Sequence, residues 1–92
     1  MIIRWLSLAT RDLDALFAFV AKDSPALAEK EVDRVIESVL PLRAQPAMGR
    51  PGRVPETREL VIQPYIVAYR VKGGIVQILR VLHSAREWPK NI

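Results

Sequence analysis

The sequence contains no cysteine and only one histidine among its 92 residues. Without cysteine it cannot form a disulfide or bind zinc through thiolates, and a single imidazole cannot build a histidine-rich metal cage. We therefore predict a protein that needs no metal and no other cofactor. The missing disulfides also fit a reducing compartment, so we predict a cytoplasmic location.

Long apolar runs are missing too, although half of the residues are hydrophobic. No window reaches the roughly 18 consecutive apolar residues that a membrane-spanning helix needs. The N-terminal stretch MIIRW alternates like a strand and lacks the charged start, apolar run and cleavage site of a signal peptide. We expect a soluble protein that is not exported, has no membrane partner and forms one domain over residues 1–92.

Acidic residues are fewer than basic ones, 10 against 14, which gives a formal net charge of +4. This balance favours an acidic partner, either nucleic acid or a negatively charged protein, although many small domains are basic without such a partner. Several arginines gather in GRPGRVPETREL, residues 49–60, where prolines and glycines interrupt any apolar period. The pattern predicts a loop that presents Arg50 and Arg53.

The chain begins with the pattern of a strand followed by a helix. Residues 2–6 alternate like a strand, and Ser7 is placed to cap a helix over residues 8–22. Apolar residues at three- and four-residue spacing predict one packing face on this helix. That face contains Leu13, Leu16, Phe17 and Val20.

A second helix is predicted directly after the first. Ser24 suits its N-cap and Pro25 its first position, where the missing amide costs nothing. Pro41 should end or kink this helix near Leu40, because its ring would clash with the carbonyl one turn earlier. The apolar stripe of the second helix contains Ala28, Val32, Val35, Val39 and Leu42.

The second half of the chain has the pattern of three strands rich in Val, Ile, Leu and Tyr. The strands are expected over residues 57–62, 65–72 and 75–83. Gly73-Gly74 favours a two-residue hairpin turn, because both glycines can take a positive φ. Such a turn places Arg70 opposite Gln77 and Lys72 opposite Ile75.

Strict alternation along these strands predicts two distinct sheet faces. The more apolar face, which should receive the helices, contains Tyr65, Val67, Tyr69, Val71, Val76, Ile78, Arg80 and Leu82. The open face carries Arg70 and His83, with Glu59 diagonal to Arg70. Arg80 would be buried, so either a bulge turns it outward or an acid from a helix reaches it.

These elements predict an α+β fold. An N-terminal strand is followed by an antiparallel two-helix hairpin, which packs on one face of a largely antiparallel four-stranded sheet.

In this order the elements resemble the RelE/ParE superfamily of toxins from type II toxin-antitoxin systems. The resemblance spans nearly the whole chain. It is carried by three fragments in sequence, which are Arg58-Glu59-Leu60, the run YIVAYRV over residues 65–71, and Leu79-Arg80-Val81-Leu82-His83 followed by Ala85-Arg86. It implies a toxin with a RelE/ParE-like fold that an acidic antitoxin, encoded next to it, binds and neutralises in a hetero-oligomer.

Two branches of the superfamily imply different targets. RelE-like members are metal-independent endoribonucleases that cut messenger RNA on the ribosome, and here such an enzyme would use His83 with Arg58, Arg70 or Arg86. ParE-like members inhibit DNA gyrase and need no hydrolytic residues. The chain lacks the basic set of RelE: Ile66 stands where that set has an arginine, and no tyrosine follows His83. We therefore favour the ParE branch, with the nuclease and a non-toxic basic binding module as alternatives.

The candidate partner-binding residues are mostly basic. They are Arg50, Arg53, Arg58, Glu59, Arg70, Arg80, His83, Arg86 and Trp88. Each also has a purely structural interpretation: Arg70 would pair with Glu59, His83 would bond to backbone at the strand end, and Trp88 would fold back over the core.

Overall fold

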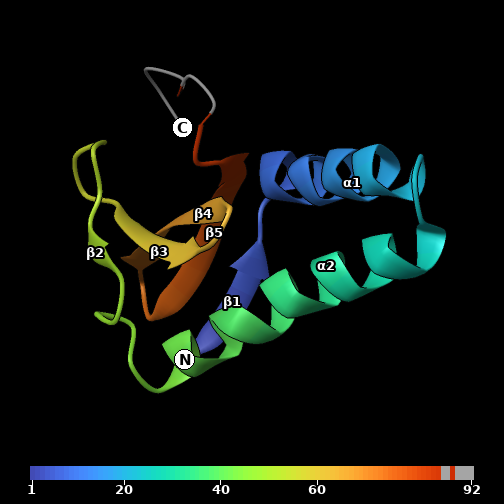
Figure 1. Ribbon diagram of the computed structural model, residues 1–92. Helices are drawn as coiled ribbons and strands as arrows, with labels where there is room; N and C mark the ends of the chain where they lie inside the picture. Colours follow the sequence, from blue (N-terminus) through green and yellow to red (C-terminus); the bar gives the residue numbers. More distant parts are fainter. Residues whose placement is uncertain (86–87, 89–92) are drawn as a thin grey trace.

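The computed structural model describes residues 1–85 and Trp88 (Figure 1). Its elements are β1 (Ile2–Trp5), α1 (Ser7–Ala21), α2 (Pro25–Val39), a 3-10 turn η1 (Leu40–Arg43), β2 (Arg50–Pro51), β3 (Arg58–Ile62), β4 (Tyr65–Lys72) and β5 (Ile75–His83). The strands form one sheet in the order β1-β5-β4-β3-β2. The predicted α+β fold is confirmed. None of the described helices is long and apolar enough to cross a membrane.

The sheet has one strand more than the sequence predicts. The extra strand, β2, is two residues long and pairs antiparallel with β3, so that Arg50 faces Glu59. It lies within the segment expected to be a loop. At the other edge β1 runs parallel to β5, while the remaining pairs are antiparallel.

The two helices form an antiparallel hairpin that extends beyond the sheet (Figure 1). As predicted, the Ser24 hydroxyl accepts a hydrogen bond from the Leu27 amide at 3.1 Å, and Pro25 occupies the first position of α2. The predicted cap at Ser7 is wrong. Leu6 is the N-cap residue because its amide still bonds to the Ile78 carbonyl, so Ser7 already lies inside the helix.

The hydrophobic core lies between the helices and one face of the sheet. Its buried members are Ala9, Leu16, Val35, Val39, Leu42, Ile62, Val67, Tyr69, Val76, Ile78 and Val81. Phe17 was expected on the packing face of α1 but is 39% exposed. One residue further along a helix turns about 100°, so Phe17 lies outside the stripe to which Leu16 belongs.

The β4–β5 hairpin has the predicted register at its turn, where Gly73 and Gly74 both have positive φ. Further along, a β-bulge interrupts it. Tyr69 faces Ile78 but Ala68 faces Arg80, so Leu79 has no partner on β4. Every β5 side chain beyond the bulge therefore lies on the opposite face from the one predicted.

The bulge places Arg70 and His83 on opposite faces of the sheet, although the sequence predicted them on the same face. Val81 and His83 lie on the helix side, since they pair with Val67 and Tyr65. Arg70 stays on the face away from the helices, which we call the far face. The far face consists of Ile2, Arg4, Arg50, Glu59, Val61, Ile66, Ala68, Arg70, Lys72, Ile75, Gln77, Arg80 and Leu82.

Candidate functional site

The arginine-rich loop is held by a single buried carboxylate. Arg50 donates to Glu59 Oε1 at 3.0 Å through Nη2, and Arg53 donates to Oε2 through its backbone amide at 2.8 Å and Nε at 3.1 Å. Glu59 is only 3% exposed. The predicted pair between Glu59 and Arg70 is wrong, because Arg70 instead donates to Gln77 Oε1 at 2.6 Å.

The electrostatics of Glu59 favour its charged form. Burial raises the pKa of this carboxyl, but the hydrogen bonds from Arg53 and Arg50 outweigh that effect and lower the pKa below its ordinary value. Two guanidinium groups share one carboxylate, and their side chains are 53% and 45% exposed. The cluster of Arg50, Arg53 and Glu59 therefore keeps one unit of positive charge near the surface.

Tyr69 fixes the beginning of the same loop from inside the core. Its hydroxyl donates to the Pro46 carbonyl at 2.7 Å and accepts from the Gly49 amide at 2.9 Å. Arg58 donates to the Gly49 carbonyl at 2.7 Å. A Cβ at position 49 would lie 2.7 Å from the Tyr69 ring, so the close approach requires glycine.

We predict that Tyr69→Phe lowers the free energy of unfolding by about 1–3 kcal/mol, because two loop backbone groups lose their partner next to a buried ring. Chemical denaturation of the wild type and the variant measures the change. Tyr65→Phe is the matched control. Tyr65 is half-buried rather than fully buried, so a smaller effect is expected. Equal losses in the two variants would contradict the role assigned to Tyr69.

Arg80 was predicted to be buried and to need either a bulge that turns it outward or an acid from a helix. The structure contains both. The bulge turns it toward the far face, and Asp12 of α1 accepts from Arg80 Nε at 2.8 Å and from Nη2 at 3.0 Å. The same carboxylate accepts from the Val81 amide at 2.8 Å. The Arg80 and Asp12 side chains are 16% and 11% exposed, so this pair joins α1 to the sheet in a largely buried position.

His83 lies at the end of β5 on the helix side. Its Nδ1 accepts a hydrogen bond from the Ala85 amide at 3.2 Å, and its ring meets the edge of the Tyr65 ring at 6.1 Å between centroids. One ring nitrogen is therefore used by the backbone, as in the structural interpretation of this residue.

A half-open cavity of about 460 Å³ runs between α1 and the ends of β4 and β5. We call it the α1 groove. It is lined by Asp12, Ala15, Leu16, Phe19, Val20, Pro64, Tyr65, Val81 and His83. The lining is mainly apolar, and Phe19 at its edge is 72% exposed. Sequence reasoning missed this groove, although an unassigned phenylalanine beside the packing stripe of α1 was a signal for it.

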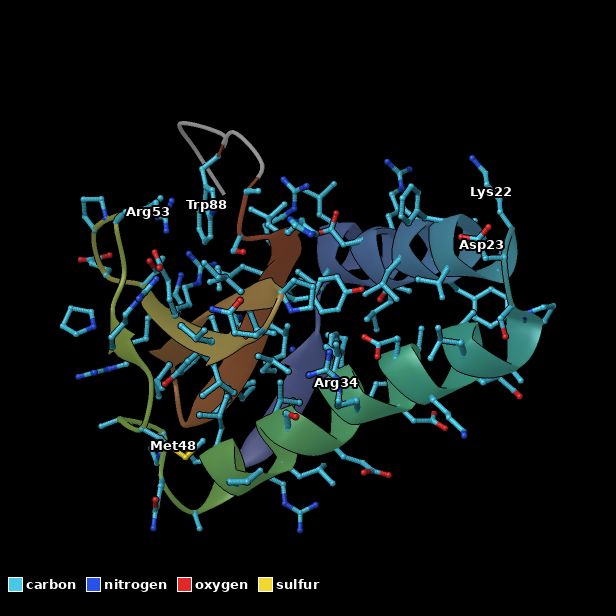
Figure 2. All side chains as sticks on the ribbon, in the orientation of Figure 1. Lys22, Asp23, Arg34, Met48, Arg53 and Trp88 are labelled. Carbon is cyan, nitrogen blue, oxygen red and sulfur yellow. The ribbon has the colours of Figure 1, made fainter. Side chains whose placement is uncertain are left out.

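Arg34 of α2 lies toward the sheet (Figure 2). Its guanidinium donates to the Gln63 carbonyl at 2.9 Å and to Glu31 at 2.8 Å, and it lies 6.0 Å from the centre of the Tyr65 ring. Burial, and to a lesser extent the nearby negative charge of Glu31, raises the pKa of the Tyr65 hydroxyl. These contacts position Tyr65 in the wall of the α1 groove.

Trp88 and Arg53 point toward one another from the C-terminal segment and the loop before β3 (Figure 2). The Arg53 guanidinium lies 3.8 Å from the centre of the indole ring, within the range of a cation–π contact. Trp88 thus meets the loop at the far face. Arg86, the remaining predicted site residue, lies outside the described residues.

The predicted catalytic residues do not converge in the described part of the chain. His83 lies on the helix side, Arg70 on the far face, and Arg58 on the loop carbonyls. In residues 1–85 and Trp88, no group of three or more His, Asp or Glu side chains is arranged to hold a metal ion. This arrangement is suited to binding a partner, because an apolar groove lies on the helix side of the sheet and cations lie on the far face.

Comparison with known proteins gives one consistent family. Residues 3–88 match the model of the ParE toxin of the type II toxin-antitoxin system parDE. The chain is 44% identical over 90 residues to Y4kP of Sinorhizobium fredii, named as a candidate toxin, with 96% of this chain and 93% of that protein covered. It is 30% identical to Toxin RelE2 of Caulobacter vibrioides, covering 89% of this chain and 93% of that one.

Two solved structures share the fold. One is the chromosomal ParDE toxin-antitoxin system of P. aeruginosa, with a TM-score of 0.82, 38% identity, and coverage of 90% of this chain and 95% of that one. The other is the toxin-antitoxin complex RelBE2 of Mycobacterium tuberculosis, with a TM-score of 0.60, 26% identity, and coverage of 89% and 95%.

Proposed function

Because the chain belongs to the ParE family of toxins from type II toxin-antitoxin systems, we propose that it arrests growth by binding and inhibiting DNA gyrase. The observation that supports binding over cleavage is the dispersal of the candidate catalytic residues. Cutting RNA through its 2′-hydroxyl needs a base, an acid and cations around one phosphate. In this chain His83 and Arg70 lie on opposite faces of the sheet.

The proposal includes a cognate antitoxin, because both structural relatives are toxin-antitoxin assemblies. The α1 groove has the shape and apolar lining that would accept the apolar face of an antitoxin helix. The antitoxin is expected to be acidic and encoded next to the toxin. Its acidic residues would meet the basic rim formed by Arg50, Arg53 and Arg58, with Trp88 as an aromatic contact.

We predict that purified protein inhibits supercoiling by DNA gyrase and that His83→Ala inhibits as strongly as the wild type. The reason is that a binding toxin needs no proton transfer at this imidazole. A supercoiling assay with both proteins, titrated over the same concentrations, measures this. Addition of the cognate antitoxin should abolish inhibition by both.

One observation favours the alternative of an RNA-cleaving toxin, since two of the relatives carry RelE names. Primer extension on translating ribosomes distinguishes the two functions. Message cleavage that falls by at least about 100-fold in His83→Ala, the loss typical of a missing general acid or base, would overturn the gyrase proposal. Inactivity in both assays, with no growth defect on expression, would instead indicate a non-toxic binding module.

A further inference from the structure

Charge is distributed unevenly between the two halves of the fold. The helical hairpin, residues 7–39, contains seven acidic and four basic residues, a formal charge of −3. The rest of the chain contains three acidic and ten basic residues, a formal charge of +7. The hairpin extends beyond the sheet (Figure 1). The molecule is therefore electrically polar, with a negative helical end and a positive sheet end.

Part of the positive charge forms an ordered row across three strands of the far face. Arg4 of β1 is in register with Gln77 of β5, which is in register with Arg70 of β4. Lys72 follows on the same face of β4, two residues after Arg70. We call Arg4, Arg70 and Lys72 the sheet cations. With neighbouring strands about 4.8 Å apart and a rise of about 3.4 Å per residue, their backbones lie roughly 7–12 Å from one another.

In the described part of the chain, no strand carboxylate on the far face is free to neutralise this row. Among the strand residues that the structure describes, Glu59 is the one acid on this face, and it already binds Arg50 and Arg53. Arg4 and Lys72 are exposed. Arg70 is half-buried, and its bond to Gln77 uses Nε alone, which fixes the side chain while its charge stays uncompensated.

We propose that the sheet cations bind the phosphate backbone of duplex DNA. Long cationic side chains at this spacing on one sheet face suit phosphates, since a duplex carries about one charge per 1.7 Å of its axis. The acidic hairpin would be repelled by the same polyanion, so the charge distribution also orients the protein. This activity goes beyond gyrase inhibition and does not depend on it.

The composition of the row favours a duplex over single-stranded RNA and over an acidic peptide. Single strands are bound by stacking bases on aromatic rings. Here Trp5, Tyr65 and Tyr69 lie on the helix side, while the Trp88 ring stacks on Arg53. Peptide interfaces depend on apolar anchors in pockets. The row instead contains cations and a glutamine, which suits binding driven by counterion release.

The test uses the full chain and a short fluorescent DNA duplex of arbitrary sequence, with anisotropy measured from about 50 to about 200 mM salt. Three phosphate contacts give a slope of about −2.7 in log K against log salt, equivalent to a roughly 40-fold loss of affinity over this range. The triple variant Arg4→Gln, Arg70→Gln, Lys72→Gln should therefore have a slope flatter by about 2.7 units. The charge-conserving variant Arg4→Lys, Arg70→Lys should keep the wild-type slope.

A matched control removes three cations from the negative end instead. The variant Arg11→Gln, Lys22→Gln, Lys30→Gln has the same net charge as the first triple variant, and its salt slope should equal that of the wild type. Circular dichroism checks that all variants are folded. Absence of duplex binding at about 50 mM salt, equal flattening by both triple variants, or tighter binding to single-stranded RNA or to an acidic peptide would overturn the proposal. Since gyrase is absent from this assay, its outcome is separate from that of the supercoiling test.

Discussion

Glu59→Ala is expected to lower the free energy of unfolding by about 2–3 kcal/mol, which for a domain of this size corresponds to a fall of roughly 10–20 °C in melting temperature. The variant removes the carboxylate that two guanidinium groups and the Arg53 amide share. The loss should be smaller than for a fully buried ion pair, because Arg50 and Arg53 are half-exposed and regain water. Thermal and chemical denaturation measure it.

The same carboxylate predicts a loss of stability in acid. The pKa of Glu59 is lower in the folded protein than its ordinary value of 4.5, so folding favours the deprotonated form. The resulting stabilisation is complete above pH 4.5 and disappears as the pH falls through the lower folded pKa. The difference in unfolding free energy between the wild type and Glu59→Gln should therefore be constant near neutrality and narrow below about pH 4.5.

Two observations would contradict this account of Glu59. One is an unchanged melting temperature in Glu59→Ala. The other is a difference between wild type and Glu59→Gln that stays constant to low pH. Hydrogen exchange adds a local measurement, since the Arg53 amide should exchange faster in Glu59→Ala, where its acceptor is gone. Glu56→Gln is the control, because this exposed carboxylate lies in the same loop.

Elements governed by local chemistry could be predicted from the sequence. The Ser24-Pro25 start of α2, the end of that helix before Pro41 and the glycine turn at residues 73–74 all depend on neighbouring residues alone. The register next to the turn follows from it, which is why Arg70 and Gln77 are opposite as expected.

The predictions that were wrong depend on contacts between distant residues. The bulge in β5 lies beside Asp12, 68 residues away from Arg80 in the sequence, and no local pattern marks it. Strict alternation along β5 therefore predicted the wrong sheet face for His83. Likewise the partner of Glu59 is a loop without periodicity that folds back onto β3, so pairing by strand geometry selected Arg70 instead. The α1 groove forms between helix and sheet, and its one signal in the sequence was Phe19, which lies beside the packing stripe of α1.

Asp12→Asn is expected to lower the free energy of unfolding by about 3–4 kcal/mol, the largest effect that we predict for a single substitution. Asparagine keeps the shape and can still accept from the Val81 amide, so the change isolates the charge. Arg80, which is 16% exposed, would keep its positive charge without a counterion. In the wild type the hydrogen bond to Asp12 raises the pKa of Arg80 above its ordinary value. Without Asp12 the guanidinium still cannot respond by losing its proton, because arginine stays charged at neutral pH in any protein environment.

A double-mutant cycle distinguishes this buried pair from general disruption of α1. Arg80→Met alone should also destabilise, but Asp12→Asn combined with Arg80→Met should cost less than the sum of the two, because no isolated charge then remains between helix and sheet. The more exposed pair of Glu31 and Arg34, whose side chains are 23% and 40% exposed, serves as the control, where Glu31→Gln should cost at most about 1 kcal/mol. Additive losses at Asp12 and Arg80 would mean that the ion pair contributes no more than its two side chains do separately. The junction of α1 with β5 would then depend on packing alone.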